Sequence, residues 1–202
     1  LTILNDRPIN AETPPHLLND SVTPTNRHFV RNNGIMPNLT SNEVNNWTLK
    51  IEGNVHKEKL YTIKDLKENF EVISKVLQLE CGGNGRAFFS PPAPGNQWTY
   101  GAISCSEWTG VRLLDVLKAS GIKDTSIYTG HYGADIHLSG NENKDAISRG
   151  VPIKKALDVN NIIAFSMNGK NIPKIHGAPL RLICPGWPGS TSQKWLTKIK
   201  VL

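Results

Sequence analysis

The chain has 202 residues and 38% hydrophobic residues, which suits one globular domain with a packed core. Its net charge of +6 comes from scattered lysines and arginines without a basic run, so nucleic acid is not the expected partner. The charge leaves two interpretations open, a solvated basic surface or the attraction of a small anionic substrate. No stretch approaches the roughly 18 unbroken apolar residues of a membrane span, and three cysteines do not make a disulfide framework.

The secondary structure is predicted to mix strands and short helices without regular alternation. Residues 1–45 are rich in Asn, Pro and Thr, which predicts an extended segment with little regular structure. We place an N-terminal arm at residues 1–24 and one domain at 25–202. Strands are expected at 47–53, 71–80, 126–130, 162–170, 180–184 and 195–202, and helices at 62–70, 110–121 and 152–158. This pattern indicates an α+β fold with mixed sheets.

Cys81 has an unusual neighbourhood. It ends a predicted strand, three of the next four residues are glycines, and Arg86 supplies a cation five residues on. Such a loop lets backbone N–H groups crowd around one point, and a positive setting favours the thiolate. A buried structural thiol, a nucleophile and a metal ligand all remain open. No second Cys or His lies at zinc spacing, but one thiolate is enough when a cofactor supplies the other ligands.

Three further segments carry clustered polar side chains. Residues 27–34, Arg-His-Phe-Val-Arg-Asn-Asn-Gly, offer donors suited to an oxyanion or phosphate, or form a polar surface loop. Residues 176–195 combine His, Arg and Lys with Gly-rich backbone, which suits a phosphorylated ligand or a connector between strands. Residues 129–140 form either a pocket loop or a surface loop.

Several of these segments resemble the sulfite oxidase family. Cys81-Gly-Gly-Asn-Gly-Arg86 resembles the Cys-Ala-Gly-Asn-Arg-Arg signature of sulfite oxidases and plant-type nitrate reductases, and Phe29-Val-Arg-Asn-Asn33 resembles their Phe-x-Arg-Asn-His element. The stretches at residues 101–113, 176–181, 185–187 and 194–196 follow in the family's order. The likeness covers residues 25–202 and is strongest to bacterial haem-free sulfite dehydrogenases. Residues 104–107 also resemble sulfane dehydrogenases of thiosulfate oxidation.

The resemblance implies a sulfite oxidase-type molybdopterin-binding fold with Cys81 as the protein ligand of molybdenum. Arg31 and Arg86 would flank the substrate anion, and Tyr132 is the candidate for the family's active-site tyrosine. Asn33 departs from the family, which has His there. The residues implied to hold the pterin and its phosphate are Phe29, Val30, Arg31, Asn32, Asn33, His131, Asp135, His176, Arg181, Ser192, Gln193 and Lys194.

The implied reaction is oxidation of sulfite to sulfate with water, releasing two electrons and two protons. No Cys-x-x-Cys-His motif for haem attachment is present, so an external c-type cytochrome is expected to accept the electrons. The likeness also implies a periplasmic location and a homodimer of the full-length protein, formed through a C-terminal dimerisation domain outside this chain. The alternatives are a sulfane dehydrogenase-like subunit of thiosulfate oxidation, a molybdenum reductase of sulfoxides, and a cofactor-free binding domain of the same fold.

Overall fold

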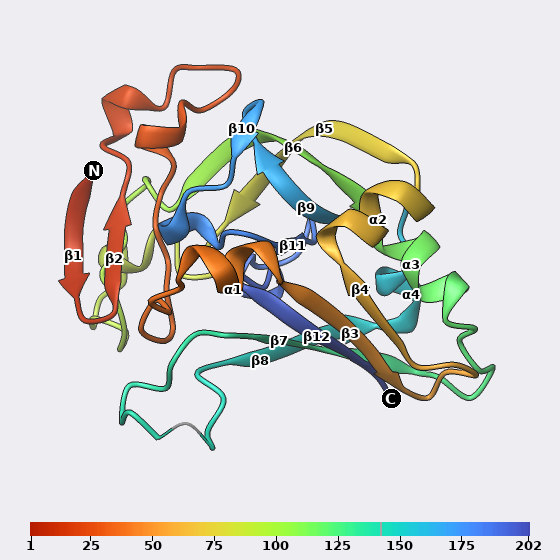
Figure 1. The fold of residues 1–202 in the computed structure, drawn as a ribbon. Coiled ribbons are helices and arrows are strands. Elements are labelled where there is room, and N and C mark those ends of the chain that lie inside the picture. Colours follow the sequence, from red (N-terminus) through yellow and green to blue (C-terminus); the bar gives the residue numbers. More distant parts are fainter. Residues whose placement is uncertain (142) are drawn as a thin grey trace.

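Two five-stranded sheets lie on opposite sides of the molecule in the computed structural model, which describes residues 1–141 and 143–202 (Figure 1). The first sheet has the order β10 (Lys170–Asn171), β9 (Ile162–Met167), β6 (Ile103–Arg112) and β5 (Val72–Glu80), and β11 (Arg181–Ile183) also pairs with β9. The second has the order β4 (Lys59–Thr62), β3 (Thr48–Gly53), β12 (Leu196–Val201), β7 (Tyr128–Gly133) and β8 (Ser148–Pro152). Within the second sheet the C-terminal strand β12 runs parallel to β3 and antiparallel to β7.

The helices are short, as expected for a mixed α+β fold. They are α1 (Ser41–Asn45), α2 (Ile63–Asn69), α3 (Leu113–Ala119) and α4 (Ile153–Ala156), with 3-10 turns η1 (Pro15–Leu17), η2 (Thr25–Arg27), η3 (Arg86–Phe88), η4 (Lys174–His176) and η5 (Gly189–Thr191). The predicted helix at 110–121 begins later, because β6 continues to Arg112 before α3 starts. It ends at Ala119, and Gly121 follows the C-cap Ser120 as the predicted closing glycine, with a φ of 65° that glycine adopts easily.

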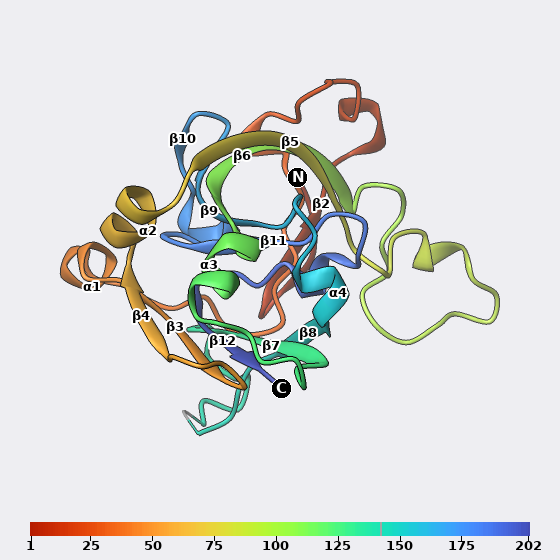
Figure 2. The same ribbon diagram turned by 90° about the vertical axis from the view of Figure 1, so that its right-hand side faces the viewer.

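The main hydrophobic core fills the space between the two sheets. Leu49 and Ile51 alternate along β3 and are fully buried, as the period of a strand requires. On α3, Leu113, Val116 and Leu117 are fully buried at helical spacing, so this helix closes the core between the sheets (Figure 2). A second cluster, around Phe29, Trp98 and Trp108, lies next to the loop that follows β5.

The N-terminal segment differs from the predicted extended arm. Strands β1 (Thr2–Asp6) and β2 (Ile9–Glu12) form an antiparallel hairpin, so the prediction of little regular structure is wrong for these residues. The hairpin joins the domain through Glu12, whose carboxylate accepts hydrogen bonds of 2.8 Å from the backbone N–H and hydroxyl of Thr99. Our division into an arm at 1–24 and a domain at 25–202 stays a prediction.

The connection between β5 and β6 extends away from the body of the molecule (Figure 2). Cys81 begins this connection directly after β5, and its backbone N–H donates to the carbonyl of Ala102 at 2.9 Å. The base of the connection is therefore fixed while its tip reaches outward. In the described part of the chain, no helix has the length and apolar character needed to cross a membrane.

Candidate functional site

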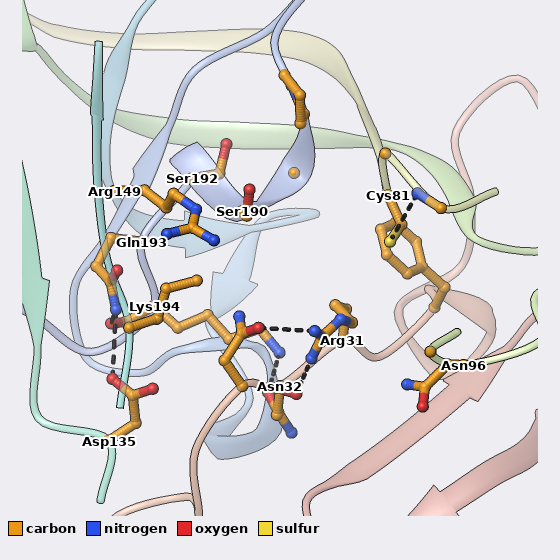
Figure 3. Close-up of a pocket in the computed structure, with 18 of the residues that line it drawn as sticks. Arg31, Asn32, Cys81, Asn96, Asp135, Arg149, Ser190, Ser192, Gln193 and Lys194 are labelled. Atoms are coloured by element: carbon orange, nitrogen blue, oxygen red, sulfur yellow. Dashed lines mark hydrogen bonds between the residues drawn. The ribbon is translucent and has the colours of Figure 1, made fainter. Parts of the chain in front are cut away.

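A single cavity of about 410 Å³ collects most of the predicted site residues (Figure 3). Its volume lies within the range that small-molecule and cofactor sites occupy. It opens between the end of β5, the segment before β12 and the neighbouring strands β8 and β11. The predicted residues that line it are Phe29, Arg31, Asn32, Asn33, Cys81, Arg86, Asp135, Arg181, Ser192, Gln193 and Lys194.

Cys81 lies half-buried on one wall of the cavity, at the point where β5 ends. Its Sγ accepts a hydrogen bond of 3.4 Å from the N–H of Gly83. The loop is braced by Asn84, whose Oδ1 accepts from the N–H of Ala102 at 3.0 Å. A rigid loop thus presents a single sulfur atom to the cavity. No three His, Cys, Asp or Glu side chains gather at a metal-binding distance within residues 1–141 and 143–202.

Arg31 lies in the middle of the cavity, and its guanidinium is held by its neighbours in the chain (Figure 3). One nitrogen donates to the side chain of Asn33 at 2.7 Å, and the other donates to the carbonyl of Asn32. Burial lowers the pKa of Arg31, the nearby Cys81 sulfur opposes this, and the charges of Arg86 and Arg149 lower it further. Arg31 therefore shares one electrostatic environment with the thiol and two other guanidinium groups.

Two further cations, Arg181 and Lys194, lie deeper and are buried. The Nζ of Lys194 donates to Asn32 Oδ1 at 2.6 Å and to the carbonyl of Ile175 at 2.8 Å. Arg181 donates to the carbonyl of His176 at 2.9 Å, and its Nε has no partner among the described residues. Burial lowers the pKa of Arg181 to about 9 and that of Lys194 well below its usual value. Neither buried charge forms a salt bridge in the described part of the chain, which is a costly arrangement unless a ligand supplies a counter-ion.

His176 and His28 form a contact behind these cations, with ring centroids 5.0 Å apart. Burial, with the charges of Lys194 and Arg181, lowers the pKa of His176 to about 3, so the imidazole is neutral at pH 7. Its buried Nδ1 has no partner within the described chain. A neutral imidazole with an unused nitrogen can donate to or accept from a bound ligand.

Asp135 is the one carboxylate among the cavity-lining residues within the described part of the chain. Burial raises its pKa to about 6, although its Oδ1 accepts a hydrogen bond of 3.3 Å from Gln193 Nε2. The Oε1 of Gln193 is buried and has no partner among residues 1–141 and 143–202. This corner therefore offers both donors and acceptors, as a heterocyclic ring would require.

Four predicted site residues do not line the cavity. Val30 and His176 lie behind it, and His131 braces η5 through a 3.2 Å contact between its Nδ1 and the carbonyl of Thr191. Tyr132 points elsewhere, because its ring lies 4.3 Å from the Nζ of Lys198. This placement argues against the suggested role of Tyr132 in the chemistry.

Other cavity-lining residues were missed from the sequence, chiefly His28, Asn96, Ile147, Arg149, Ser190 and Trp195. His28 lies within the predicted segment 27–34, and Ser190 and Trp195 lie within the segment 176–195, although none of the three was named as a site residue. Arg149 belongs to β8, which was not predicted, so nothing in its spacing pointed to the cavity.

The charges that line the cavity are strongly unbalanced. Five cations, Arg31, Arg86, Arg149, Arg181 and Lys194, face one carboxylate, and none of the five forms a salt bridge in the described part of the chain. Together with the unpartnered polar atoms of His176, Arg181 and Gln193, this set fits an anionic ligand that carries a phosphate and a polar ring. The Cys81 sulfur adds the soft ligand that a sulfur-bound metal prefers.

We expect Arg181→Ala to weaken retention of such a phosphorylated cofactor. Removing one charge-assisted hydrogen bond costs about 1.5–3 kcal/mol, so the affinity should fall by about tenfold or more. The apo-protein should not lose comparable stability, because the charge is buried without a counter-ion. Molybdopterin content per chain and the melting temperature of the apo-protein measure the two effects, and full occupancy in the variant would contradict the role.

Comparison with known proteins identifies the class to which this site belongs. The family described as oxidoreductase molybdopterin binding domain matches residues 34–202. Rat mitochondrial sulfite oxidase is 33% identical over 208 residues, which cover 100% of this chain and 37% of that protein. Barley NAD(P)H nitrate reductase is 33% identical over 202 residues, covering 96% of this chain and 22% of that protein.

A solved structure shows the same fold. The sulfane dehydrogenase SoxCD from Paracoccus pantotrophus superposes with a TM-score of 0.78 at 31% identity, covering 94% of this chain and 46% of that chain. This confirms the predicted sulfite oxidase-type fold. The chain belongs to the oxidoreductase molybdopterin-binding domain family, and the cavity around Cys81 is the place where its residues fit the cofactor. The chain spans less than half the length of these relatives.

Proposed function

We propose that this domain oxidises sulfite to sulfate with a molybdenum–molybdopterin cofactor and passes the electrons to an external c-type cytochrome. One observation carries the proposal: the Cys81 sulfur and the guanidinium groups of Arg31 and Arg86 line the same cavity as the buried cations Arg181 and Lys194. Side chains suited to bind a metal, an oxyanion and a phosphate thus line one cavity. We also propose that the catalytic unit contains no haem, that the protein is periplasmic, and that the full-length protein forms a homodimer.

The residues divide into two groups by their chemistry. Arg181 and Lys194, which line the cavity, would hold the phosphate, with His176 behind them, and Asp135 and Gln193 would hydrogen-bond the polar edge of the pterin ring. Cys81 would bind molybdenum through its thiolate. When bound, the cofactor supplies the two-electron redox chemistry and the metal at which oxygen transfer takes place.

Arg31 and Arg86 would bind and orient the substrate in this proposal. Sulfite is a small oxyanion, and planar guanidinium groups hold such oxygens in a defined direction. Arg86 belongs to the loop that begins at Cys81, and Arg31 lines the same cavity and is half-buried, where an ionic hydrogen bond is stronger than in water. Their charges also stabilise negative charge as it shifts during oxidation.

The direct test is sulfite-dependent reduction of ferricyanide by the full-length protein, with molybdenum measured in the same preparation. We expect turnover at about one molybdenum per chain, and the same reaction with a soluble c-type cytochrome as acceptor. Molybdenum without sulfite turnover would contradict the proposed substrate. Absence of molybdenum from a protein produced in cells competent in cofactor synthesis would favour a cofactor-free binding domain.

A sulfane dehydrogenase-like function is the second candidate. It is favoured by the structural similarity to SoxCD, a sulfane dehydrogenase by title, at a TM-score of 0.78. Parallel assays with sulfite and with a protein-bound sulfane sulfur separate the two candidates, because each predicts turnover of a different substrate. The nitrate reductase relatives make nitrate the natural third substrate to include.

A further inference from the structure

Arg149 lines the cavity, but it belongs neither to the proposed cofactor-binding residues nor to the proposed substrate-binding pair, Arg31 and Arg86. It lies on β8, where it pairs with His131 on β7, and its neighbour two positions back, Ile147, also lines the cavity. The guanidinium of Arg149 therefore reaches the cavity from β8, a strand of the second sheet. The loop of Cys81 comes from the first sheet, on the other side of the cavity (Figure 3).

The Arg149 guanidinium has no acidic partner among residues 1–141 and 143–202. Its hydrogen bond is to the carbonyl of the adjacent Ser148 at 3.2 Å. Its charge nevertheless reaches Arg31, whose own charged form it disfavours. Like charges that line one cavity are unfavourable without an anion between or beside them.

The surroundings of Arg149 suit a small anion at the entrance of the cavity. Figure 3 shows its guanidinium beside Ser190 and Ser192, across the cavity from Cys81. Ser192 already accepts a hydrogen bond from the N–H of Cys184 at 2.9 Å. Ser190 lies on η5 and lines the cavity, so its hydroxyl can join Arg149 in binding an oxyanion.

Exposure separates Arg149 from the phosphate cradle. Arg181 and Lys194 are buried, as expected for residues that hold a resident cofactor, whereas Arg149 is exposed to solvent at the mouth of the same cavity. An exposed cation in a positively charged cleft raises the local concentration of anions and their rate of entry. Because Arg149 is exposed whereas Arg181 and Lys194 are buried, we infer that Arg149 binds the substrate or product, which exchanges with solvent, and not the resident cofactor.

We propose that Arg149, with Ser190, forms an entry site that captures sulfur oxyanions and passes them to Arg31 and Arg86. That the captured oxyanion is sulfite rests on the proposed function. That the entry site binds anions does not rest on it. The sulfate product would leave past the same group, so both the capture of substrate and the affinity for product depend on Arg149.

The test compares Arg149→Gln, Arg149→Lys and the control Lys154→Gln at matched molybdenum content. Lys154 is an exposed cation on α4 that does not line the cavity, so it matches the change in net charge. At low ionic strength, Arg149→Gln should lower kcat/KM for sulfite by about fivefold to tenfold, and high salt should remove most of the difference. Lys154→Gln should follow the wild type, and Arg149→Lys should keep most of the salt dependence because it keeps the charge.

A second measurement does not depend on turnover. The Kd of inorganic sulfate for the molybdenum-loaded protein, obtained by isothermal titration calorimetry, should rise by about fivefold or more in Arg149→Gln. If sulfite is not turned over by the wild type, the proposed function fails, while the sulfate comparison still tests Arg149. Sulfate affinity and salt dependence within a factor of two of the wild type would overturn the entry site. So would a loss of molybdopterin from Arg149→Gln at unchanged sulfate affinity, which would assign Arg149 to the cofactor.

Discussion

Replacing Cys81 by serine is expected to abolish sulfite oxidation and to leave the fold intact. The sulfur is the soft ligand of the cavity, and a serine hydroxyl does not ionise at neutral pH to replace a thiolate on molybdenum. Serine can still accept the hydrogen bond that the Gly83 N–H makes to Sγ at 3.4 Å, so the loop keeps its shape. The measurements are turnover, molybdenum per chain and the melting temperature.

Cys105→Ser provides the matched control for this prediction. Cys105 is also a half-buried free thiol, it lies on β6, and it does not line the cavity. The control should keep wild-type turnover, with a change in unfolding free energy of at most about 1 kcal/mol. Turnover near the wild type in a molybdenum-loaded Cys81→Ser protein would show that the thiolate is not the ligand that the chemistry needs.

The parts of the site that the sequence predicted are those encoded by short contiguous segments. The segment 29–33 and the segment 192–194 each place several side chains at the cavity, and each contains consecutive polar residues outside regular strands and helices. Cys81 was recognisable by the glycines around it, which allow its loop to approach a ligand. Such features can be recognised from the sequence because they depend only on residues that are close together in the chain.

Residues that reach the cavity through strand pairing were not predictable in the same way. Arg149 enters it because β8 pairs with β7 in one register, and a shift by one residue would turn its side chain to the other face of the sheet. Tyr132 shows the converse, because it is adjacent in sequence to His131 but lies on the opposite face of β7, over Lys198. Register is set by contacts between distant segments, and no local pattern reports it.

The fold shows the same division between local and distant information. The capping box of Thr62 and Asp65 begins α2 where the sequence placed a helix. The hairpin of β1 and β2 was missed because its few apolar residues do not alternate over enough positions to predict strands. Its place is fixed by distant contacts, such as Asn10 Oδ1, which accepts from the N–H of Asn32 at 2.8 Å. The N-terminal segment thereby supports the loop that carries Arg31.

Arg86 is held in a defined position by the loop of Cys81. Its Nη1 donates to the carbonyl of Asn96 at 3.0 Å, and the guanidinium lies against the backbone of Gly83 and Gly95. A Cβ at either glycine would collide with the guanidinium, so these two positions leave room for it. The group therefore presents its remaining N–H donors to the cavity from a fixed direction, which is what a bidentate oxyanion contact requires.

Arg86→Lys is expected to keep the charge and lose this geometry, because an ammonium is a compact point charge without the planar fork. The loss of a charge-assisted hydrogen bond of about 1.5–3 kcal/mol corresponds to a fall in kcat/KM for sulfite of about tenfold to a hundredfold, mainly through a higher KM. Arg86→Gln should lose more, because the charge is removed as well. The measurement is kcat and KM of the wild type, Lys and Gln proteins at matched molybdenum content.

A structural role for Arg86 predicts a different result. If its contact with Asn96 only braced the loop, both substitutions would lower stability and molybdenum content to a similar degree. At matched content, kcat/KM would then agree among the three proteins within a factor of two, and Arg86 would not be a substrate ligand. Because the guanidinium lines the same cavity as the Cys81 sulfur, and this cavity has an excess of positive charge, we expect the graded loss from arginine to lysine to glutamine.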